Sequence, residues 1–285
     1  IGDRRQRQMC IRDRSKNVPN IKYERCKKLI LMEKNMKKIL ITFAFLFASV
    51  TSFADDHVPN IVAMEMFACN YNKGKDLTDS LKVVEEWNEY IDSTDASYIA
   101  WILEPYYTNP DEQYESYWIG FAPTFEAMGK AQETMFTDEG LKLNEKFNRV
   151  STCDAHSLWG VQAVKQPEDS FEDGFLAASR CKLLEGATPQ KILSADKKWS
   201  DYMDSKGMKG GIFRWYAGPG VSMAFSEEYD LVTINTVDSL STFGSGADIN
   251  VNGGGNMMAA SLYGELMQCE DMRVYTATAA RTAQN

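Results

Sequence analysis

The sequence predicts an α+β protein in which one βαββαβ unit occurs twice. The first observation is a recurrence: three residues of one copy return 112 positions later, namely Cys69, Trp87 and Tyr90 as Cys181, Trp199 and Tyr202. The second is that strand and helix periodicities follow one another in the same order in both copies. A period of this length indicates a duplicated domain rather than a solenoid repeat.

The shift between the copies drifts slowly along the chain, which indicates small loop insertions in the second copy. It is 114 between Trp101 and Trp215, and 116 between Cys153 and Cys269.

The first 54 residues are set apart from the fold. Residues 1–35 are rich in Lys and Arg, have no apolar periodicity, and resemble translated upstream DNA. Residues 36–54 have the pattern of a secretory signal peptide, with a basic start, an apolar run from Ile39 to Val50 and small residues before Asp55. We therefore expect a secreted or periplasmic protein that begins at Asp55, without a membrane span.

The charge of the remaining chain excludes some partners. The whole sequence carries a formal net charge of −9, but without residues 1–54 it holds 18 Lys and Arg and 36 Asp and Glu, a net of −18. Such a surface repels nucleic acid and anionic lipid. We expect neither as a partner.

In the first copy, Ile61 to Ala68 is a predicted strand, and Asp76 is placed to cap a helix. The apolar positions of that helix are spaced for one face: Leu77, Leu81, Val84, Trp87 and Ile91. The elements expected after it are strands at Tyr98 to Leu103 and Tyr117 to Phe121, a helix near Asp138 to Val150 and a strand at Ser157 to Val164.

In the second copy, Thr188 and Pro189 are the expected cap and first residue of a helix. The elements expected after it are strands at Gly211 to Ala217 and Leu231 to Ile234, a helix at Met257 to Gln268 and a strand at Met272 to Ala277. A Gly- and Asn-rich stretch at 244–256 suggests a mobile loop that covers a cleft.

These elements divide the chain into a module at 55–165, a polar, proline-bearing linker at 166–173 and a module at 174–285. The order βαββαβ is that of the ferredoxin-like unit, whose first and last strands lie side by side and antiparallel. This topology predicts the disulfides Cys69–Cys153 and Cys181–Cys269, which an oxidising compartment would allow. Free buried thiols are the alternative.

Two tandem ferredoxin-like modules with Trp-rich strands resemble the dimeric α+β barrel superfamily, in which two such sheets pair into a barrel. The strand at 61–68 is apolar on both faces, with Met64 on one and Ala63 on the other, so a second layer must cover it. The other module is the expected cover. Because the duplication reproduces a dimer within one chain, a monomer is consistent with this resemblance.

The resemblance implies several activities, among them cofactor-free monooxygenases and haem enzymes, and the fold selects none. A haem peroxidase site would need a histidine on a helix. After the predicted cleavage site the chain has only His57, close to that site, and His156, beside a strand. The spacings typical of zinc ligands are also missing. We expect no cofactor and no metal.

Residues that differ between the copies are the candidates for a site. Arg214 corresponds to Ala100 and Tyr216 to Ile102, so the fold itself does not require that charge. A buried guanidinium must be paired or must face a polar cavity. One hypothesis is an anion anchor in an aromatic pocket with the tryptophans Trp101, Trp118 and Trp215; the other is a structural salt bridge.

Glu65 lies in an apolar strand and could partner an arginine or act as a base, and its expected counterpart is the uncharged Ser179. His156 completes the set of candidate ligand-binding residues. Three functions remain open: binding of a small organic ligand, cofactor-free oxidase or monooxygenase activity, and a structural or interaction role.

Overall fold

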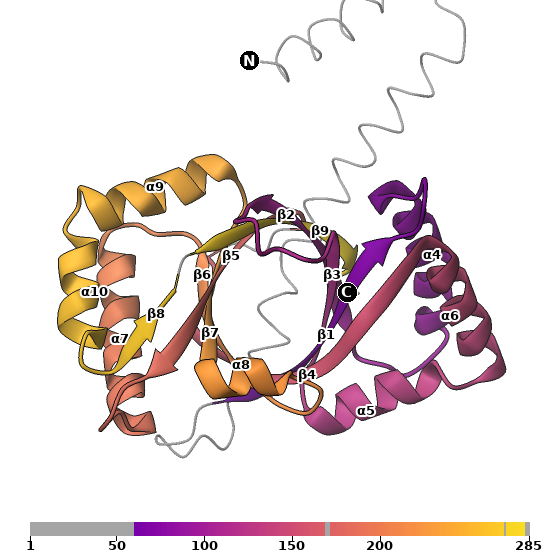
Figure 1. The fold of residues 1–285 in the computed structure, drawn as a ribbon, viewed down its shortest axis with the longest axis horizontal. Helices are drawn as coiled ribbons and strands as arrows, with labels where there is room; N and C mark the ends of the chain where they lie inside the picture. Colours follow the sequence, from indigo (N-terminus) through magenta and orange to yellow (C-terminus); the bar gives the residue numbers. More distant parts are fainter. Residues whose placement is uncertain (1–59, 169–171, 271, 283–285) are drawn as a thin grey trace, which may run out of the picture. The chain divides into compact units, whose positions relative to one another are not determined.

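The computed structural model describes residues 60–168, 172–270 and 272–282. In this part of the chain nine strands form one antiparallel sheet, and eight of them close into a barrel (Figure 1). The predicted leader, the signal peptide and the cleavage site before Asp55 lie outside the described residues, as does His57.

The strands run around the barrel in the order β7-β6-β4-β1-β3-β2-β9-β5, and a β7–β5 pairing closes the ring. The short β8 pairs with the end of β5. The strand bounds are β1 Ile61–Tyr71, β2 Ile99–Tyr107, β3 Ser116–Ala122, β4 Ser151–Lys165, β5 Gly174–Leu183, β6 Gly211–Ala217, β7 Leu231–Val237, β8 Met267–Cys269 and β9 Arg273–Arg281.

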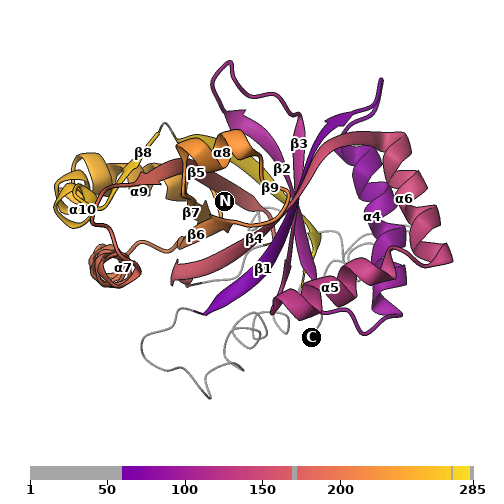
Figure 2. The same ribbon diagram turned by 60° about the horizontal axis from the view of Figure 1, so that its bottom comes forward.

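Helices lie outside the barrel, in two groups that follow the two halves of the chain (Figure 2). Those of the first half are α4 Leu77–Asp92, α5 Phe125–Thr134 and α6 Asp138–Val150. Those of the second half are α7 Pro189–Ser205, α9 Leu240–Val251 and α10 Gly255–Tyr263, with the short α8 Met223–Glu228 between β6 and β7.

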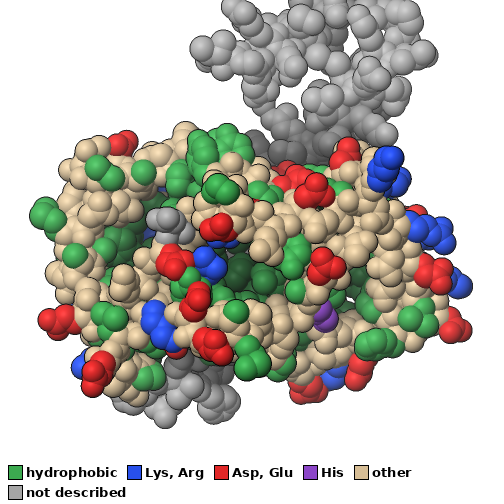
Figure 3. All heavy atoms as spheres, viewed as in Figure 1, with side chains coloured by type: hydrophobic (Ala, Val, Ile, Leu, Met, Phe, Trp, Pro, Cys, Tyr) green, Lys and Arg blue, Asp and Glu red, His purple; other side chains and the backbone are tan. Residues whose placement is uncertain are grey.

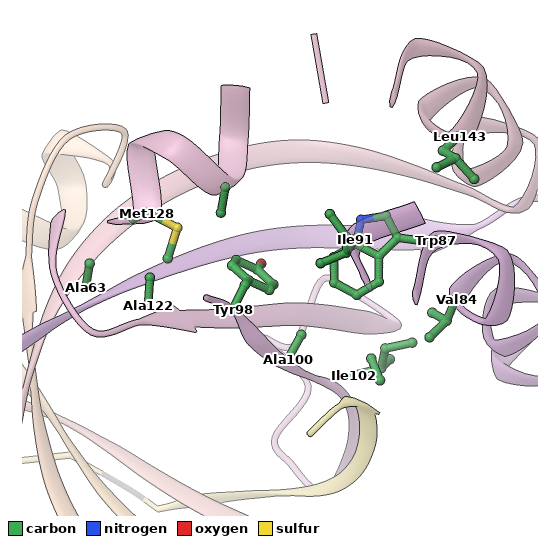
Figure 4. Packing of buried hydrophobic residues seen from close by; sticks show 12 residues of the cluster. Ala63, Val84, Trp87, Ile91, Tyr98, Ala100, Ile102, Ala122, Met128 and Leu143 are labelled. Carbon is green, nitrogen blue, oxygen red and sulfur yellow. The ribbon is translucent and has the colours of Figure 1, made fainter. Parts of the chain in front are cut away.

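The layer between the first helices and the sheet is an apolar core. Ala63, Ala100 and Ala122 of the strands are buried there together with Trp87 of α4. Figure 4 shows Tyr98 in this layer, with Met128 on one side and Trp87 on the other. In the second half Trp199 of α7, which recurs 112 residues after Trp87, is buried in the equivalent layer.

Local sequence explains where the helices begin. The Asp76 carboxylate accepts a hydrogen bond from the backbone N–H of Asp79 at the start of α4. Thr188 accepts from Lys191 N–H, and Pro189 is the first residue of α7. Both caps are those predicted, because a side-chain oxygen that satisfies a free N–H is a local signal.

Both predicted disulfides are present. Cys69 is opposite Cys153 in the β1–β4 pairing, and Cys181 is opposite Cys269 in the β5–β8 pairing. In the first half the antiparallel contact of the first and last strands brings the cysteines together, and in the second half the short β8 before the last strand does so.

The prediction of a mobile loop at 244–256 is wrong, because α9 and α10 occupy most of this stretch. Ser239 caps α9 by accepting from Thr242 N–H, and only a short turn separates the helices. Gly254, with φ of 85°, makes that turn. Gly246 lies against Met208, so its small size serves packing. The helix expected at Met257 to Gln268 instead ends at Tyr263 and is followed by β8.

In the described residues, no helix has both the length and the apolar character needed to cross a membrane.

Candidate functional site

Glu65 is a carboxylate buried in the layer between the sheet and the helices. It lies on β1 opposite Gly120 of β3 and Leu158 of β4, and only 6% of it is exposed. Since successive side chains of a strand alternate between faces, Glu65 shares the outer face with the buried Ala63. A carboxylate at this depth needs hydrogen-bond donors from the elements around it.

Three side chains from separate parts of the chain surround the carboxylate: Tyr98 just before β2, Gln132 of α5 and His156 of β4. The Tyr98 hydroxyl donates to Oε1 of Glu65. Gln132 of α5 donates from Nε2 to Oε2 at 2.9 Å, and Nε2 of His156 lies 2.8 Å from the same oxygen. Burial, followed by the neighbouring Glu65 charge, raises the pKa of Tyr98 well above its ordinary value, so the phenol keeps the proton it donates.

Two further residues hold Tyr98 in place. Trp118 donates from its indole Nε1 to the Tyr98 hydroxyl at 2.8 Å. Gly120 leaves room for the phenol, since a Cβ at that position would lie 1.6 Å from the hydroxyl oxygen. A side chain at 120 would therefore displace Tyr98 from Glu65.

His156 carries the cluster to the surface. Its ring stacks on Phe67, with centroids 3.8 Å apart and planes 8° from parallel. Its side chain is 46% exposed, and Figure 3 shows a histidine at the surface of this face. In neutral imidazole only one nitrogen carries a proton, and Nε2 needs it to donate to the carboxylate. Nδ1 then has a free lone pair and no hydrogen-bond partner among the described residues.

Arg214 forms a separate cluster on the outer face of the second half. Its Nη2 lies 2.7 Å from Oδ1 of Asp196 on α7, and its Nη1 donates to the Thr233 hydroxyl at 2.9 Å. Tyr263 of α10 donates to the same Asp196 oxygen at 2.8 Å. Arg214 and Asp196 are 2% and 3% exposed, which is the arrangement of the structural salt bridge considered from the sequence.

Tyr216 lies near this pair but bonds elsewhere. Its hydroxyl donates to Oε1 of Gln162 at 3.0 Å. Burial, followed by the Asp196 charge, raises its pKa. The tyrosine thus helps to fill the layer beneath α7 and α10.

The four residues of the predicted aromatic pocket, Arg214 and the three tryptophans, are not brought together in the structure. Trp118 belongs to the Glu65 cluster, whereas Trp101 and Trp215 alternate to the inner face of the sheet. There Phe121 contacts both, with ring centroids 5.9 Å from Trp101 and 6.5 Å from Trp215. Arg214 lies on the opposite face of β6 from Trp215.

The strand registers also correct the residue equivalences. With Cys69 and Cys181 superposed, Glu65 takes the place of Ala177 rather than Ser179. Arg214, opposite Thr233, takes the place of Ile102, which is opposite Trp118. The sequence comparison aligned Trp101 with Trp215, which shifted the expected counterparts by two residues. In both cases the counterpart in the other half is still uncharged.

Tyr98, Gln132 and Gly120 were not predicted as parts of a site. Gln132 lies on α5, a helix that the sequence pattern did not reveal. Tyr98 looked like the first residue of an apolar strand. The usable signal was Glu65 itself, because a buried carboxylate demands donors on the same face.

No family model matches the chain, and no curated protein matches it either. Among solved structures, a heme-binding protein from Thermus thermophilus is 9% identical with a TM-score of 0.45, over 78% of this chain and 95% of that chain. A proposed monooxygenase from Lactobacillus acidophilus is 11% identical with a TM-score of 0.49, over 78% and 95%. A chlorite dismutase variant from Candidatus Nitrospira defluvii is 7% identical with a TM-score of 0.45, over 77% and 92%. These values transfer no activity and no residue role to this chain.

Proposed function

We propose that this protein is a cofactor-free oxidase or monooxygenase that uses His156 as a general base. The observation that carries the proposal is the imidazole held by a buried carboxylate at Nε2, with an unbonded Nδ1 at the surface. A carboxylate in this place orients the ring and stabilises the imidazolium formed when Nδ1 takes a proton.

The chemistry requires a small organic substrate with an acidic C–H or O–H group, such as an enolisable phenolic ketone. His156 removes that proton, and the resulting anion is electron-rich enough to reduce dioxygen. For an oxidase, the substrate loses two electrons and two protons overall, and dioxygen takes them up as hydrogen peroxide. Glu65 accepts hydrogen bonds throughout.

The same geometry supports a second candidate, ligand binding without turnover. Nδ1 of His156 can accept a hydrogen bond from a ligand hydroxyl, while the Phe67 ring fixes the plane of the imidazole. A purely structural or interaction role is the third hypothesis, and two measurements separate all three.

The tautomer is tested first, because it needs no substrate. Nitrogen-15 NMR should show His156 protonated at Nε2 and unprotonated at Nδ1. Oxygen uptake and peroxide formation are then measured with a panel of phenolic ketones. His156→Gln should reduce the rate by about 10²-fold or more, and Glu65→Gln by about 10–100-fold.

The matched control is Glu126→Gln, which removes an exposed carboxylate of α5 that is paired only with Lys130. Its oxygen uptake should equal that of the unmodified protein. Ligand-induced shifts of the His156 resonances without oxygen uptake would favour the binding function. A proton on Nδ1 would overturn both site proposals and leave the structural role.

We also infer that the barrel consists of two tandem ferredoxin-like modules, at 55–165 and 174–285, in the manner of the dimeric α+β barrel superfamily. The strand order supports this, since β4-β1-β3-β2 in the first half is repeated as β9-β5-β7-β6 in the second. Closure of the ring by one chain supports a monomer. The two disulfides support a secreted or periplasmic location.

A further inference from the structure

A hollow of about 330 Å³ lies at one end of the barrel, away from the Glu65 cluster. It is lined by the end of β2, the residues after it and the start of β9, namely Tyr106, Tyr107, Thr108, Asn109, Met272 and Arg273. The proposed oxidase site has no residue in common with it.

The two tyrosines are among the exposed aromatic side chains of the described residues. Tyr106 is 46% and Tyr107 54% exposed, and their rings meet edge to face with centroids 4.7 Å apart. Neither hydroxyl has a hydrogen-bond partner among the described residues. Aromatic side chains that are exposed to water within a surface hollow are typical of a binding site.

A β-bulge is the reason that both rings reach the hollow. Pro105 is opposite Tyr275 of β9, and Tyr107 is opposite the next residue, Val274, so Tyr106 has no partner on that strand. Without the bulge, neighbouring side chains would point to opposite faces of the sheet. Bulges of this kind redirect side chains and are frequent beside functional sites.

A carboxylate outside the hollow, Glu112, holds one of its lining residues, Arg273. Glu112 accepts hydrogen bonds from the Tyr117 hydroxyl and from the Tyr275 hydroxyl, the latter at 2.9 Å. Arg273 approaches the same carboxylate with Nη1 at 3.4 Å, and its side chain is 17% exposed. The guanidinium is therefore held beside the hollow that it lines.

The charges at the hollow favour a neutral ligand. Glu112 offsets the Arg273 charge, and the whole chain carries a net charge of −9, so an anion is disfavoured. Asn109 uses its Oδ1 to accept from Asp111 N–H, which leaves its amide hydrogens available. The hollow thus offers aromatic faces and neutral or neutralised donors, the combination that suits the C–H face and hydroxyls of a sugar ring.

We propose that this hollow binds a neutral saccharide, with a sugar ring against Tyr106 or Tyr107 and its hydroxyls hydrogen-bonded by Arg273 and Asn109.

The test is saturation-transfer NMR with the full chain and four neutral disaccharides: cellobiose, maltose, lactose and diacetylchitobiose. At least one should bind. Its affinity should fall by about tenfold in Tyr106→Ala or Tyr107→Ala. The matched control is Phe136→Ala, which removes another exposed aromatic ring, 76% exposed, far from the hollow along the chain.

Binding should persist in His156→Gln, so failure of the oxidase proposal would leave this result intact. Three outcomes would overturn the saccharide site: none of the four sugars binds, binding survives in both tyrosine variants, or digalacturonic acid binds as tightly as the neutral sugars.

Discussion

At the scale of single residues, the two halves of the barrel solve the problem of buried charge differently. Glu65 accepts from neutral donors and lies against a histidine that reaches the surface, whereas Arg214 is paired with an opposite charge that is itself buried. Only the first arrangement places a free lone pair, on Nδ1 of His156, at the surface, because the unbonded Oδ2 of Asp196 is buried. The sequence indicated both residues, because a charge inside an apolar strand is conspicuous, but it could not indicate which partners the helices would bring.

Replacement of Arg214 by alanine should lower the free energy of unfolding by about 3–5 kcal/mol, because it leaves the Asp196 carboxylate buried without its partner. Chemical denaturation measures this. The control is Lys197→Ala on α7, the helix that also carries Asp196. The ion pair of Lys197 with Asp201 is exposed and should contribute at most about 1 kcal/mol to stability. A loss for Arg214→Ala no larger than that of the control would return Arg214 to the candidates for ligand binding.

At the scale of helices and strands, features set by a few neighbouring residues could be predicted from the sequence. Features set by packing against other elements could not. Helix starts at Asp76 and Thr188 depend on one side chain and one backbone N–H, so they are visible in sequence. α5 and α9 were missed because their apolar faces are weak: only Met128 and Ala131 of α5 are buried, and only Gly246 of α9. Their positions are decided by the layer they cover.

Each disulfide should stabilise its half of the barrel, because it joins the ends of a long loop and so restricts the unfolded chain. The bridge between Cys69 and Cys153 closes 84 residues, which corresponds to about 4–5 kcal/mol in the chain-entropy description. The double variant Cys69→Ser, Cys153→Ser should unfold at lower denaturant concentration by that amount or less. Peptide mapping without reductant checks the pairing, and a bridge between Cys69 and Cys181 would refute the order of strands around the barrel.

At the scale of the whole molecule, the apolar character of both faces of β1 predicted that something covers its inner side. The closed ring is that cover, and sequence duplication indicated its source. The register between the strands of the two halves follows the shift of 112 residues seen for Cys69 and Cys181, whereas the match of Trp101 with Trp215 misplaced it, because those two tryptophans are not at equivalent positions. Trp101 takes the place of Phe213, and Trp215 that of Leu103.

Alkaline pH should destabilise the whole fold through its buried tyrosines. Burial is the main cause that raises the pKa of six of them, namely Tyr71, Tyr98, Tyr117, Tyr216, Tyr263 and Tyr275. In the unfolded chain these phenols lose protons near about pH 10, while the folded chain still retains them. The contribution of these protonated phenols to the free energy of unfolding is therefore complete below that pH and declines as the pH rises further.

Thermal melts across this range, with tyrosinate absorbance followed in parallel, measure the effect. Tyrosinate should appear together with unfolding. Ionisation of all tyrosines near pH 10 in a chain that stays folded would contradict the burial of these six phenols.

The closure of the ring has a consequence for how this protein can change over generations. The halves pair backbone to backbone along two seams, β4 with β6 and β2 with β9. Helices cover the outer face mainly of their own half, although α4 also contacts β9 and α7 also contacts β4. Side chains of the outer layer can therefore change in one half while the backbone pairing of the ring is kept, so Glu65 in one half and the ion pair of Arg214 in the other could each arise without reopening the barrel.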